Sequence, residues 1–231
     1  MTYSSALFKN KQITLLEAQI QKYDSIIENL NINSSSDICE IGCGWGGFID
    51  RSKQRKNGVS VDGYTISKKQ YGYTKLNHNN VFFEDYRKIN KKYSNVVSIE
   101  MFEAVGKKYW NIYFEKLNNL LKKNGTACLQ IITINEGSFR RYLNNVDFIQ
   151  KYIFPGGMLP TKSILQKLFK NNGFKLYHKI SFGYDYSRTL LEWKQNFNNA
   201  WPKLKSNDFD EKFKRLWNYY LDYCETGFSL D

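Results

Sequence analysis

Apolar side chains recur along the chain in two patterns. Stretches with an apolar residue every three to four positions alternate with short apolar runs. Residues 12–30 carry them every three to four positions, which is typical of an amphipathic helix, and the polar stretch Asn31–Ser36 ends this helix. Further helical stretches include Tyr109–Leu121 and Ser163–Asn171. The strand candidates are Ile38–Ile41, Val59–Thr65, Val81–Phe83, Val96–Ile99, Ala127–Ile134 and Phe174–Ile180. Strands that alternate with helices predict an α/β fold, with a mostly parallel twisted sheet covered by helices on both faces.

A glycine-rich loop follows the first strand candidate. In the segment EIGCGWGG, Gly42, Gly44 and Gly46 stand at alternate positions, so the backbone can turn tightly and approach a ligand without a Cβ in the way. The helix that follows presents free N–H groups at its first turn. The spacing G-x-G-x-G-G differs from the dinucleotide form G-x-G-x-x-G and is the S-adenosylmethionine form. A tight strand-to-helix turn without any ligand is the alternative interpretation.

The end of the second strand candidate departs from the general nucleotide-binding pattern. A carboxylate usually stands there to hold the ribose hydroxyls. This chain has Thr65 instead, and Asp62 lies three residues earlier. Side chains alternate between the two faces of a strand, and the sequence does not decide which face Asp62 occupies. We therefore expect Thr65 and Gln70 to make the polar cofactor contacts.

Composition narrows the class of protein. The 231 residues, 42% of them hydrophobic, suit one globular α/β domain. No run of about 18 apolar residues would span a membrane, and the first residues lack the layout of a signal peptide, so we expect a cytoplasmic protein. Four scattered cysteines and two histidines argue against a disulfide framework, a metal site or a Ser-His-Asp triad. We expect no metal.

The formal charge of +12 favours partners such as nucleic acid or an anionic lipid surface. The chain is also rich in Lys, Asn and Ile together, as compositional drift in an AT-rich genome would make it. Charge alone therefore does not decide between these partners.

Several longer segments resemble the cyclopropane-fatty-acyl-phospholipid synthase family, which includes the mycolic acid cyclopropane synthases. The likeness covers nearly the whole chain, and the strings MFEAVG and KYIFPGG in this order are far more specific than the glycine loop. The similar segments are Thr2–Phe8, Glu40–Phe48, Val61–Gln70, Glu84–Arg87, Ser98–Gly106, Asp147–Pro160, Asp185–Leu190 and Tyr219–Phe228. The resemblance implies one Rossmann-like class I methyltransferase domain, divided into a helical cap (1–36), a cofactor-binding half (37–135) and an acyl-substrate-lining half (136–231).

By the same resemblance, the protein moves the methyl group of S-adenosylmethionine onto the cis double bond of an unsaturated phospholipid acyl chain. An alkene has no proton to remove before attack, so positioning in a dry pocket is the main requirement. Aromatic faces stabilise the resulting carbocation by roughly 1–2 kcal/mol each. The implied cofactor contacts are Tyr3, Ser4, Glu40, Ile41, Gly42, Cys43, Gly44, Trp45, Gly46, Gly47, Phe48, Thr65, Ile66, Ser67, Gln70, Asp85 and Tyr86.

Ring closure needs a base that takes a proton from the new methyl group, and in this family the base is attributed to a bound bicarbonate ion. Its implied surroundings are Ser5, Glu103, Gln130, the backbone of Ile132, and Tyr186. Two of these depart from the family, because Ser5 stands in place of its typical Cys and Gln130 in place of its typical His. A Gln amide can still donate to an anion. The departures leave room for a methyl-branched product or a changed substrate.

Two further candidates carry alternative interpretations. Glu103 beside an anion would need a raised pKa or a shared proton, and the alternative is an acid at a helix N-terminus. Cys224 matches a cysteine long suspected as a nucleophile in this family. The mechanism needs no thiol, so we favour a structural role for Cys224.

The apolar segment Phe148–Leu159 resembles the acyl-lining region of the family. The basic residues Lys151 and Lys162, within and after this segment, could contact lipid head groups. The expected partner is therefore unsaturated phospholipid at an anionic membrane surface, with peripheral association and a homodimer left open. The family commonly carries a further N-terminal region, and its final strand is not evident here. A compact version and a fragment of a longer reading frame both stay open.

Three other functions remain as alternatives. The first is an S-adenosylmethionine-dependent C-methyltransferase that gives a methyl-branched lipid or acts on another small molecule. The second is an inactive cofactor-binding remnant. RNA binding is disfavoured, because no run of Lys and Arg interleaves with stacking aromatics in a recognised module.

Overall fold

The structure is a computed structural model that describes residues 2–205 and 209–230. The chain separates into two compact units. One consists of Met1–Ser4 and Tyr23–Lys179, and the other of Ser5–Lys22 and Ile180–Asp231. Helix α1, Leu15–Asn29, begins in the second unit and ends in the first.

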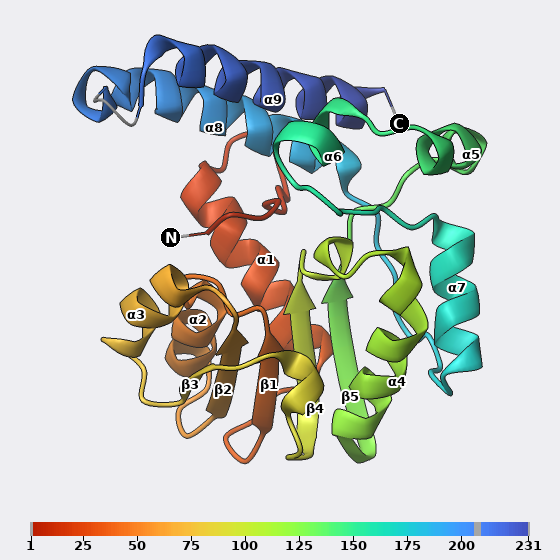
Figure 1. The fold of residues 1–231 in the computed structure, drawn as a ribbon. Coiled ribbons are helices and arrows are strands. Elements are labelled where there is room, and N and C mark those ends of the chain that lie inside the picture. The colour runs from red at the N-terminus through yellow and green to blue at the C-terminus, as the bar shows by residue number, and fades with distance from the viewer. Residues whose placement is uncertain (1, 206–208, 231) are drawn as a thin grey trace. The chain divides into compact units, whose positions relative to one another are not determined.

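The first unit contains a five-stranded parallel sheet in the order β3-β2-β1-β4-β5 (Figure 1). The strands are β1 (Asp37–Ile41), β2 (Ser60–Thr65), β3 (Val81–Phe83), β4 (Tyr93–Ile99) and β5 (Leu121–Gln130). The helices of this unit are α2 (Gly47–Arg55), α3 (Lys68–Lys75), α4 (Trp110–Leu120), α5 (Glu136–Asn144), α6 (Phe148–Tyr152) and α7 (Lys162–Asn171). The predicted α/β class with a parallel sheet is confirmed.

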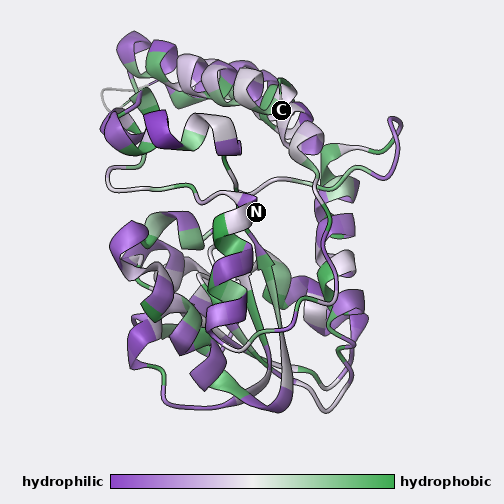
Figure 2. Cartoon of the chain, turned by 90° about the vertical axis from the view of Figure 1, so that its right-hand side faces the viewer, coloured by the Kyte–Doolittle hydropathy of each residue, from purple (hydrophilic) through white to green (hydrophobic). Residues whose placement is uncertain are grey.

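Successive strand residues face opposite sides of this sheet and feed two separate hydrophobic cores. Ile38 and Val97 belong to the core that contains the apolar residues of α1 and α2. Cys39 and Val96, their neighbours in sequence, belong to the core that contains those of α4. This alternation is expected of strands buried on both faces. Figure 2 shows hydrophobic colouring in the sheet and on parts of the helices.

The fifth strand differs from the predicted Ala127–Ile134 at both ends. Its pairing with β4 shifts register between Tyr93 and Asn95, where β5 bends through Asn124 at a positive φ of 64°. The strand ends at Gln130 because the backbone then turns away from β4. The N–H of Ile132 donates to the carboxylate of Glu103 instead of to a strand.

The predicted strand Phe174–Ile180 was wrong. The segment has no regular secondary structure, although four of its seven residues are apolar or aromatic. Only Phe174 packs against a core, on Phe114 and Phe169, whereas the Tyr177 side chain is 80% exposed. A strand needs a hydrogen-bonding neighbour, and in the described part of the chain no strand runs beside β5 on its outer side.

In the second unit, the long helices α8 (Gly183–Leu204) and α9 (Glu211–Ser229) form a helical hairpin (Figure 1). Lys194 pairs with Asp222 at 2.6 Å, and the amides of Asn198 and Asn218 bond reciprocally at 2.7 and 3.2 Å. Among the helices that the structure describes, none combines the length and apolar character needed to cross a membrane.

We expect Phe114→Ala to destabilise the first unit by about 3–5 kcal/mol, because it opens a large cavity in the core. The Phe114 side chain is fully buried, and its ring lies 5.1 Å from that of Phe169 and 5.3 Å from that of Phe102. Urea unfolding measures the change. Tyr177→Ala removes an exposed ring and should shift stability by less than about 0.5 kcal/mol. Equal effects of the two changes would contradict this description of the core.

Candidate functional site

The glycine loop leaves the carboxyl end of β1 in a conformation that favours glycine. Gly42, Gly44 and Gly46 have φ values of 78°, 54° and 85°. A Cβ on Gly42 would lie 2.9 Å from Met101 Cγ, and one on Gly46 would lie 2.9 Å from Thr74 Cγ2. A Cβ on Gly44 would meet nothing within 4 Å. The loop is therefore packed behind Gly42 and Gly46 and open at Gly44, where a ligand can approach the backbone.

Contacts from β2 and α3 hold the loop in place. The carbonyl of Tyr64 accepts the N–H groups of both Gly42 and Cys43, and the Thr74 hydroxyl donates to the carbonyl of Gly44 at 3.1 Å. The Trp45 ring packs edge-on against Tyr73, with 5.4 Å between centroids. These contacts fix the loop before any ligand binds.

The helix that follows the loop anchors its far end. The Phe48 ring is fully buried and packs edge-on against Tyr23. The space beside Gly47 is narrow, since a Cβ there would lie 2.7 Å from the Tyr23 hydroxyl and 3.2 Å from the hydroxyl of Thr2. The beginning of the chain thus lies beside the glycine loop, where Tyr3 is exposed and Ser4 is buried.

Glu40 places a buried carboxylate directly before the loop, with only 3% of the residue exposed. Burial, and then the charge of Glu40, raise the pKa of the Cys43 thiol to about 12. A buried carboxylate is costly unless a cation or hydrogen-bond donors face it. The predicted residues Glu40, Ile41 and Cys43 therefore form a buried wall that suits a positively charged group.

The end of β2 carries a compact polar turn. The Thr65 hydroxyl donates to Gln70 Oε1 at 3.1 Å and accepts the N–H of Ser67. The Ser67 side chain in turn caps α3 by accepting the N–H of Gln70. Ile66 is 74% exposed beside them. The predicted set Thr65, Ile66, Ser67 and Gln70 is thus one structural element.

A carboxylate at the end of this strand usually contacts the ribose, whereas the Asp62 carboxylate bonds residues of the protein itself. Its buried carboxylate accepts from Lys91 Nζ at 2.7 Å and from the Tyr93 hydroxyl at 2.9 Å. The Tyr93 hydroxyl also bonds that of Tyr64 at 2.7 Å. The Asp62 carboxylate is therefore engaged by Lys91 and Tyr93, and the cofactor contacts expected of Thr65 and Gln70 stay a prediction.

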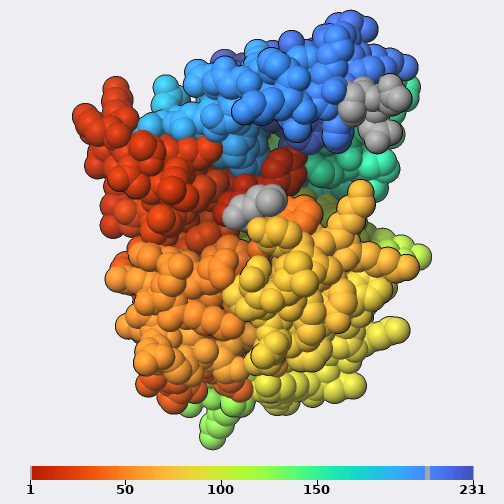
Figure 3. Space-filling model, turned by 90° about the vertical axis from the view of Figure 1, so that its left-hand side faces the viewer, coloured from red at the N-terminus to blue at the C-terminus, as the bar shows by residue number. Residues whose placement is uncertain are grey.

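An open groove lies beside the edge strand β3, on the part of the surface coloured orange and yellow in Figure 3. Its lining residues are Ile66, Tyr71, Lys75, Val81, Phe82, Phe83, Glu84, Asp85 and Lys88. Asp85 caps the next turn and pairs with Arg87, which lowers the pKa of the carboxyl. The ring of Tyr86 packs edge-on against Tyr113. Asp85 and Ile66, both predicted cofactor contacts, share this groove.

Three of the residues implied for the anion lie together at the carboxyl ends of β4 and β5. Glu103 Oε1 accepts the N–H of Ile132 at 2.5 Å, while its buried Oε2 meets no hydrogen-bond partner among the described residues. Gln130 Nε2 donates to Glu100 Oε1 at 2.7 Å. Burial, and then the charge of Glu100, raise the pKa of Glu103 to about 8. Glu103 therefore holds a proton at neutral pH.

Sequence reasoning assigned no role to Glu100, although the residue lies within the recognised segment Ser98–Gly106. Its φ is 49°, in the left-handed region that a residue with a Cβ seldom adopts. A single sequence records the residue type but not the φ. The only available signal was a carboxylate directly after an apolar strand.

The remaining predicted residues belong to the second unit. The Ser5 hydroxyl is buried and donates to the carbonyl of Ala6. Tyr186 stacks on Phe228 with 4.3 Å between ring centroids, and Cys224 lies on α9 and forms no disulfide with any described residue. The approach of Ser5, Tyr186 and Cys224 to the glycine loop stays a prediction.

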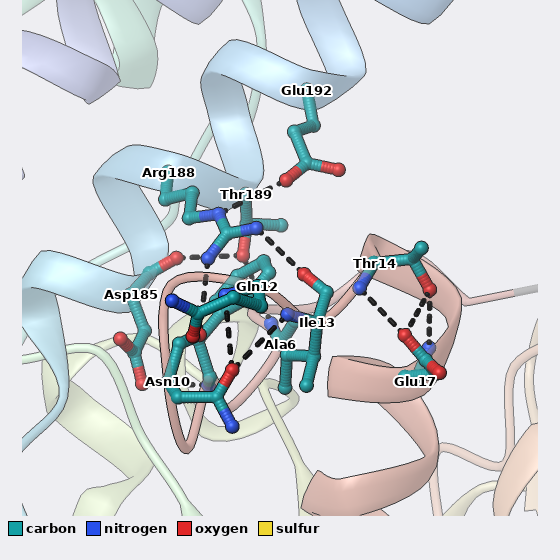
Figure 4. Close-up of polar contacts among 11 residues, drawn as sticks. Ala6, Asn10, Gln12, Ile13, Thr14, Glu17, Asp185, Arg188, Thr189 and Glu192 are labelled. Atoms are coloured by element: carbon teal, nitrogen blue, oxygen red, sulfur yellow. Dashed lines mark hydrogen bonds and ion pairs between the residues drawn. The ribbon is translucent and has the colours of Figure 1, made fainter.

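A polar clamp on α8 holds the N-terminal segment of this unit (Figure 4). The guanidinium of Arg188 lies 3.9 Å from the Phe8 ring centroid and donates to the carbonyls of Asn10 and Ile13. Asp185 accepts the N–H of Phe8. Thr189 likewise accepts the N–H of Ala6. The motifs TYSSALF and DYSRTL, far apart in sequence, are thus joined by direct contacts.

Comparison with known families gives a match over the whole chain. The family model described as "Mycolic acid cyclopropane synthetase" matches residues 1–231. A cyclopropane-fatty-acyl-phospholipid synthase of Escherichia coli is 36% identical over 233 residues, which cover 99% of this chain and 59% of the relative. A tuberculostearic acid methyltransferase of Mycobacterium tuberculosis is 33% identical over 242 residues, with 99% and 57% covered. The chain thus spans less than two thirds of the length of these relatives.

Solved structures show the same fold. A cyclopropane synthase from Mycobacterium tuberculosis matches with a TM-score of 0.89 and 27% identity, covering 99% of this chain and 86% of that one. A mycolic acid cyclopropane synthase in complex with SAH and CTAB matches with a TM-score of 0.85 and 27% identity, over 98% and 86% of the two chains. The class I methyltransferase fold is thereby confirmed.

We expect Glu103→Gln to change how stability depends on pH. The raised pKa means that folded Glu103 keeps a proton that the unfolded chain releases above its ordinary value of 4.5. Wild-type stability should therefore fall as the pH rises between about 5 and about 8, and the variant should lack this loss. The gap between the two should reach on the order of 4 kcal/mol in urea unfolding at about pH 8. Parallel stability curves would show that Glu103 is not a buried acid.

We expect Arg188→Gln to loosen the N-terminal segment, because it removes the stack on Phe8 and two carbonyl contacts. Hydrogen exchange at the amides of Ala6 and Phe8 should become at least about tenfold faster. Arg140→Gln, on the exposed face of α5, is the matched control. Unchanged exchange at both amides would mean that Asp185 and Thr189 hold the segment without Arg188.

Proposed function

This chain belongs to the mycolic acid cyclopropane synthetase family, and we propose that it transfers the methyl group of S-adenosylmethionine to the cis double bond of an unsaturated lipid acyl chain. The observation that carries the proposal is the glycine loop. It is braced from behind at Gly42 and Gly46, open at Gly44 and adjacent to the buried carboxylate of Glu40.

The residues around this loop fit S-adenosylmethionine. The cofactor's methionine part carries an ammonium group, which the Glu40 carboxylate would attract. The hydroxyl and amide groups of Thr65 and Gln70 are of the kind that bond ribose hydroxyls, and the groove with Ile66 and Asp85 suits the adenine. When bound, the cofactor supplies an electrophilic methyl group on a sulfonium.

The chain's own residues would then orient the methyl group and the alkene and exclude water. The cofactor end of the site lies at the carboxyl end of β1, and the protonated Glu103 lies beyond the neighbouring β4. Methyl transfer to an alkene needs no base, so alignment of the two reactants accounts for this step. The carbocation that results requires a dry and aromatic surrounding.

We propose that phospholipid at an anionic membrane surface is the methyl acceptor. The net charge of +12 supports attraction to such a surface. In the predicted acyl-lining region, Tyr152 and Phe154 are 56% and 47% exposed, and Lys151 lies over the Tyr152 ring. A relative named for the phospholipid reaction supports the same substrate, while the tuberculostearic acid methyltransferase supports a methyl-branched product as the alternative.

The bicarbonate ion that the resemblance implies fits these residues poorly. Of its implied donors, the Ile132 N–H already bonds Glu103, and the Gln130 amide nitrogen already bonds Glu100. An added anion would also lie beside the Glu100 carboxylate, and like charges at close range repel. We therefore assign no step to bicarbonate.

We expect the protein to label unsaturated phospholipid in vesicles when it is given S-adenosylmethionine with a fully deuterated methyl group. Mass spectrometry distinguishes the products, because a cyclopropane keeps two of the deuterium atoms and a methylated alkene formed by loss of a chain proton keeps three. Vesicles with and without anionic lipid test the role of charge.

Gly44→Val should abolish labelling by filling the open face of the loop, whereas Gly72→Val should not. Both glycines have open space at the Cβ position, but Gly72 lies on α3. Cofactor binding without any labelled lipid would contradict the proposal. It would favour a remnant or another small-molecule substrate.

A further inference from the structure

The carboxyl end of β4 holds a carboxylate that the family resemblance does not assign. Glu100 follows β4 directly, and Ile99, its neighbour, pairs in register with Gln130 at the end of β5. The backbone of Glu100 has a left-handed φ of 49°. Non-glycine residues in this region are strained, and such strain gathers at functional sites. The observed strain therefore raises the question of what Glu100 does.

Gln130 holds both the backbone and the side chain of Glu100. The backbone N–H of Glu100 donates to the backbone carbonyl of Gln130 at 2.8 Å. Gln130 Nε2 donates to Glu100 Oε1 at 2.7 Å, and Glu100 is only partly exposed. Gln130 thus serves to orient Glu100.

Strand pairing places Glu100 beside the glycine loop. Ile41, directly before the loop, pairs with Ser98, two residues before Glu100. Glu103 follows three residues later, and burial and then the charge of Glu100 raise its pKa. β1 is the strand between β2 and β4, and ligands of open α/β sheets bind beyond such strand ends. Glu100 therefore stands where a cofactor and a substrate would meet.

We propose that the Glu100 carboxylate is the proton acceptor of ring closure in this chain and takes the place of a bound bicarbonate ion. This inference rests on the proposed function. After methyl transfer, a C–H bond of the new methyl group breaks, and its electron pair forms the second C–C bond to the cationic carbon. The proton goes to a carboxylate oxygen of Glu100 and then to water. No further reactant is needed.

The pair of carboxylates divides the acid and base roles. Glu103 is buried and keeps its proton at neutral pH, so it adds no negative charge beside the acceptor. Glu100 Oε1 accepts an N–H from Gln130, a contact that orients its carboxylate. Bicarbonate would bring a second anion next to Glu100.

The test compares Glu100→Gln, which keeps the shape, with Glu100→Gly, which also relieves the left-handed φ and so guards against misfolding. With deuterated cofactor and vesicles, both variants should bind S-adenosylmethionine as the wild type does. The ring product should fall at least about 100-fold, and the share of methylated alkene should rise. Glu115→Gln, on the exposed face of α4, is the control and should match the wild type.

The second arm uses buffers scrubbed of carbon dioxide. Wild-type ring formation should be unchanged there, and added bicarbonate should partly restore it in Glu100→Gly, where a cavity replaces the carboxylate. A wild-type enzyme that loses the ring product without bicarbonate and regains it with bicarbonate would overturn the proposal. So would full ring formation by Glu100→Gln.

A binding measurement separates this inference from the proposed function. Carbon-13 NMR of labelled bicarbonate should show no binding to the wild type at about 10 mM, where like charges oppose it. Binding to the wild type would overturn the role of Glu100 even if no lipid were labelled. If the protein labels no lipid and also binds no bicarbonate, the proposed lipid reaction is wrong. The conclusion that Glu100 keeps bicarbonate out of the site would then still stand.

Discussion

The parallel pairing of β1 with β2 on one side and β4 on the other is the constraint on which the site depends. Ile41 pairs with Tyr64 in one direction and with Ser98 in the other, so three strands end at one edge of the sheet. The Tyr64 carbonyl then accepts two N–H groups of the loop that leaves β1. Without this anchor the alternating glycines would allow many conformations. With it, the loop and the segment after β4 are held in register.

The sequence predicts those parts of the fold that local pattern controls. The alternation of strands with helices, the glycine loop and the turn at Thr65 all follow from short stretches of chain. Partners distant in sequence decide the rest. Asp62 is turned inward by Lys91 and Tyr93, about 30 residues away, and the segment at Phe174 forms no strand because no described neighbour pairs with it. The anion site was only partly predictable, because the φ of Glu100 is invisible in the sequence.

The N-terminal motif gains a physical explanation from the second unit. Its backbone has no helix or strand over residues 2–14, so its N–H and C=O groups need partners from elsewhere. Asp185, Arg188 and Thr189 on α8 provide them. Three polar residues within two helical turns thus explain why the motifs TYSSALF and DYSRTL occur together in one chain. The contacts between them serve folding, in addition to any contact that either motif makes with a ligand.

The departure at Gln130 makes sense only together with Glu100. Taken alone, a Gln would be a weaker replacement for a histidine in an anion site. Here its side-chain nitrogen donates to the Glu100 carboxylate, so the residue orients a carboxylate that is part of the chain. Its backbone carbonyl also accepts the N–H of Glu100. An acceptor fixed by folding needs no ion from solution and no ordering at the moment of reaction. The strained φ of Glu100 is the cost that this arrangement carries, and the reciprocal hydrogen bonds offset it.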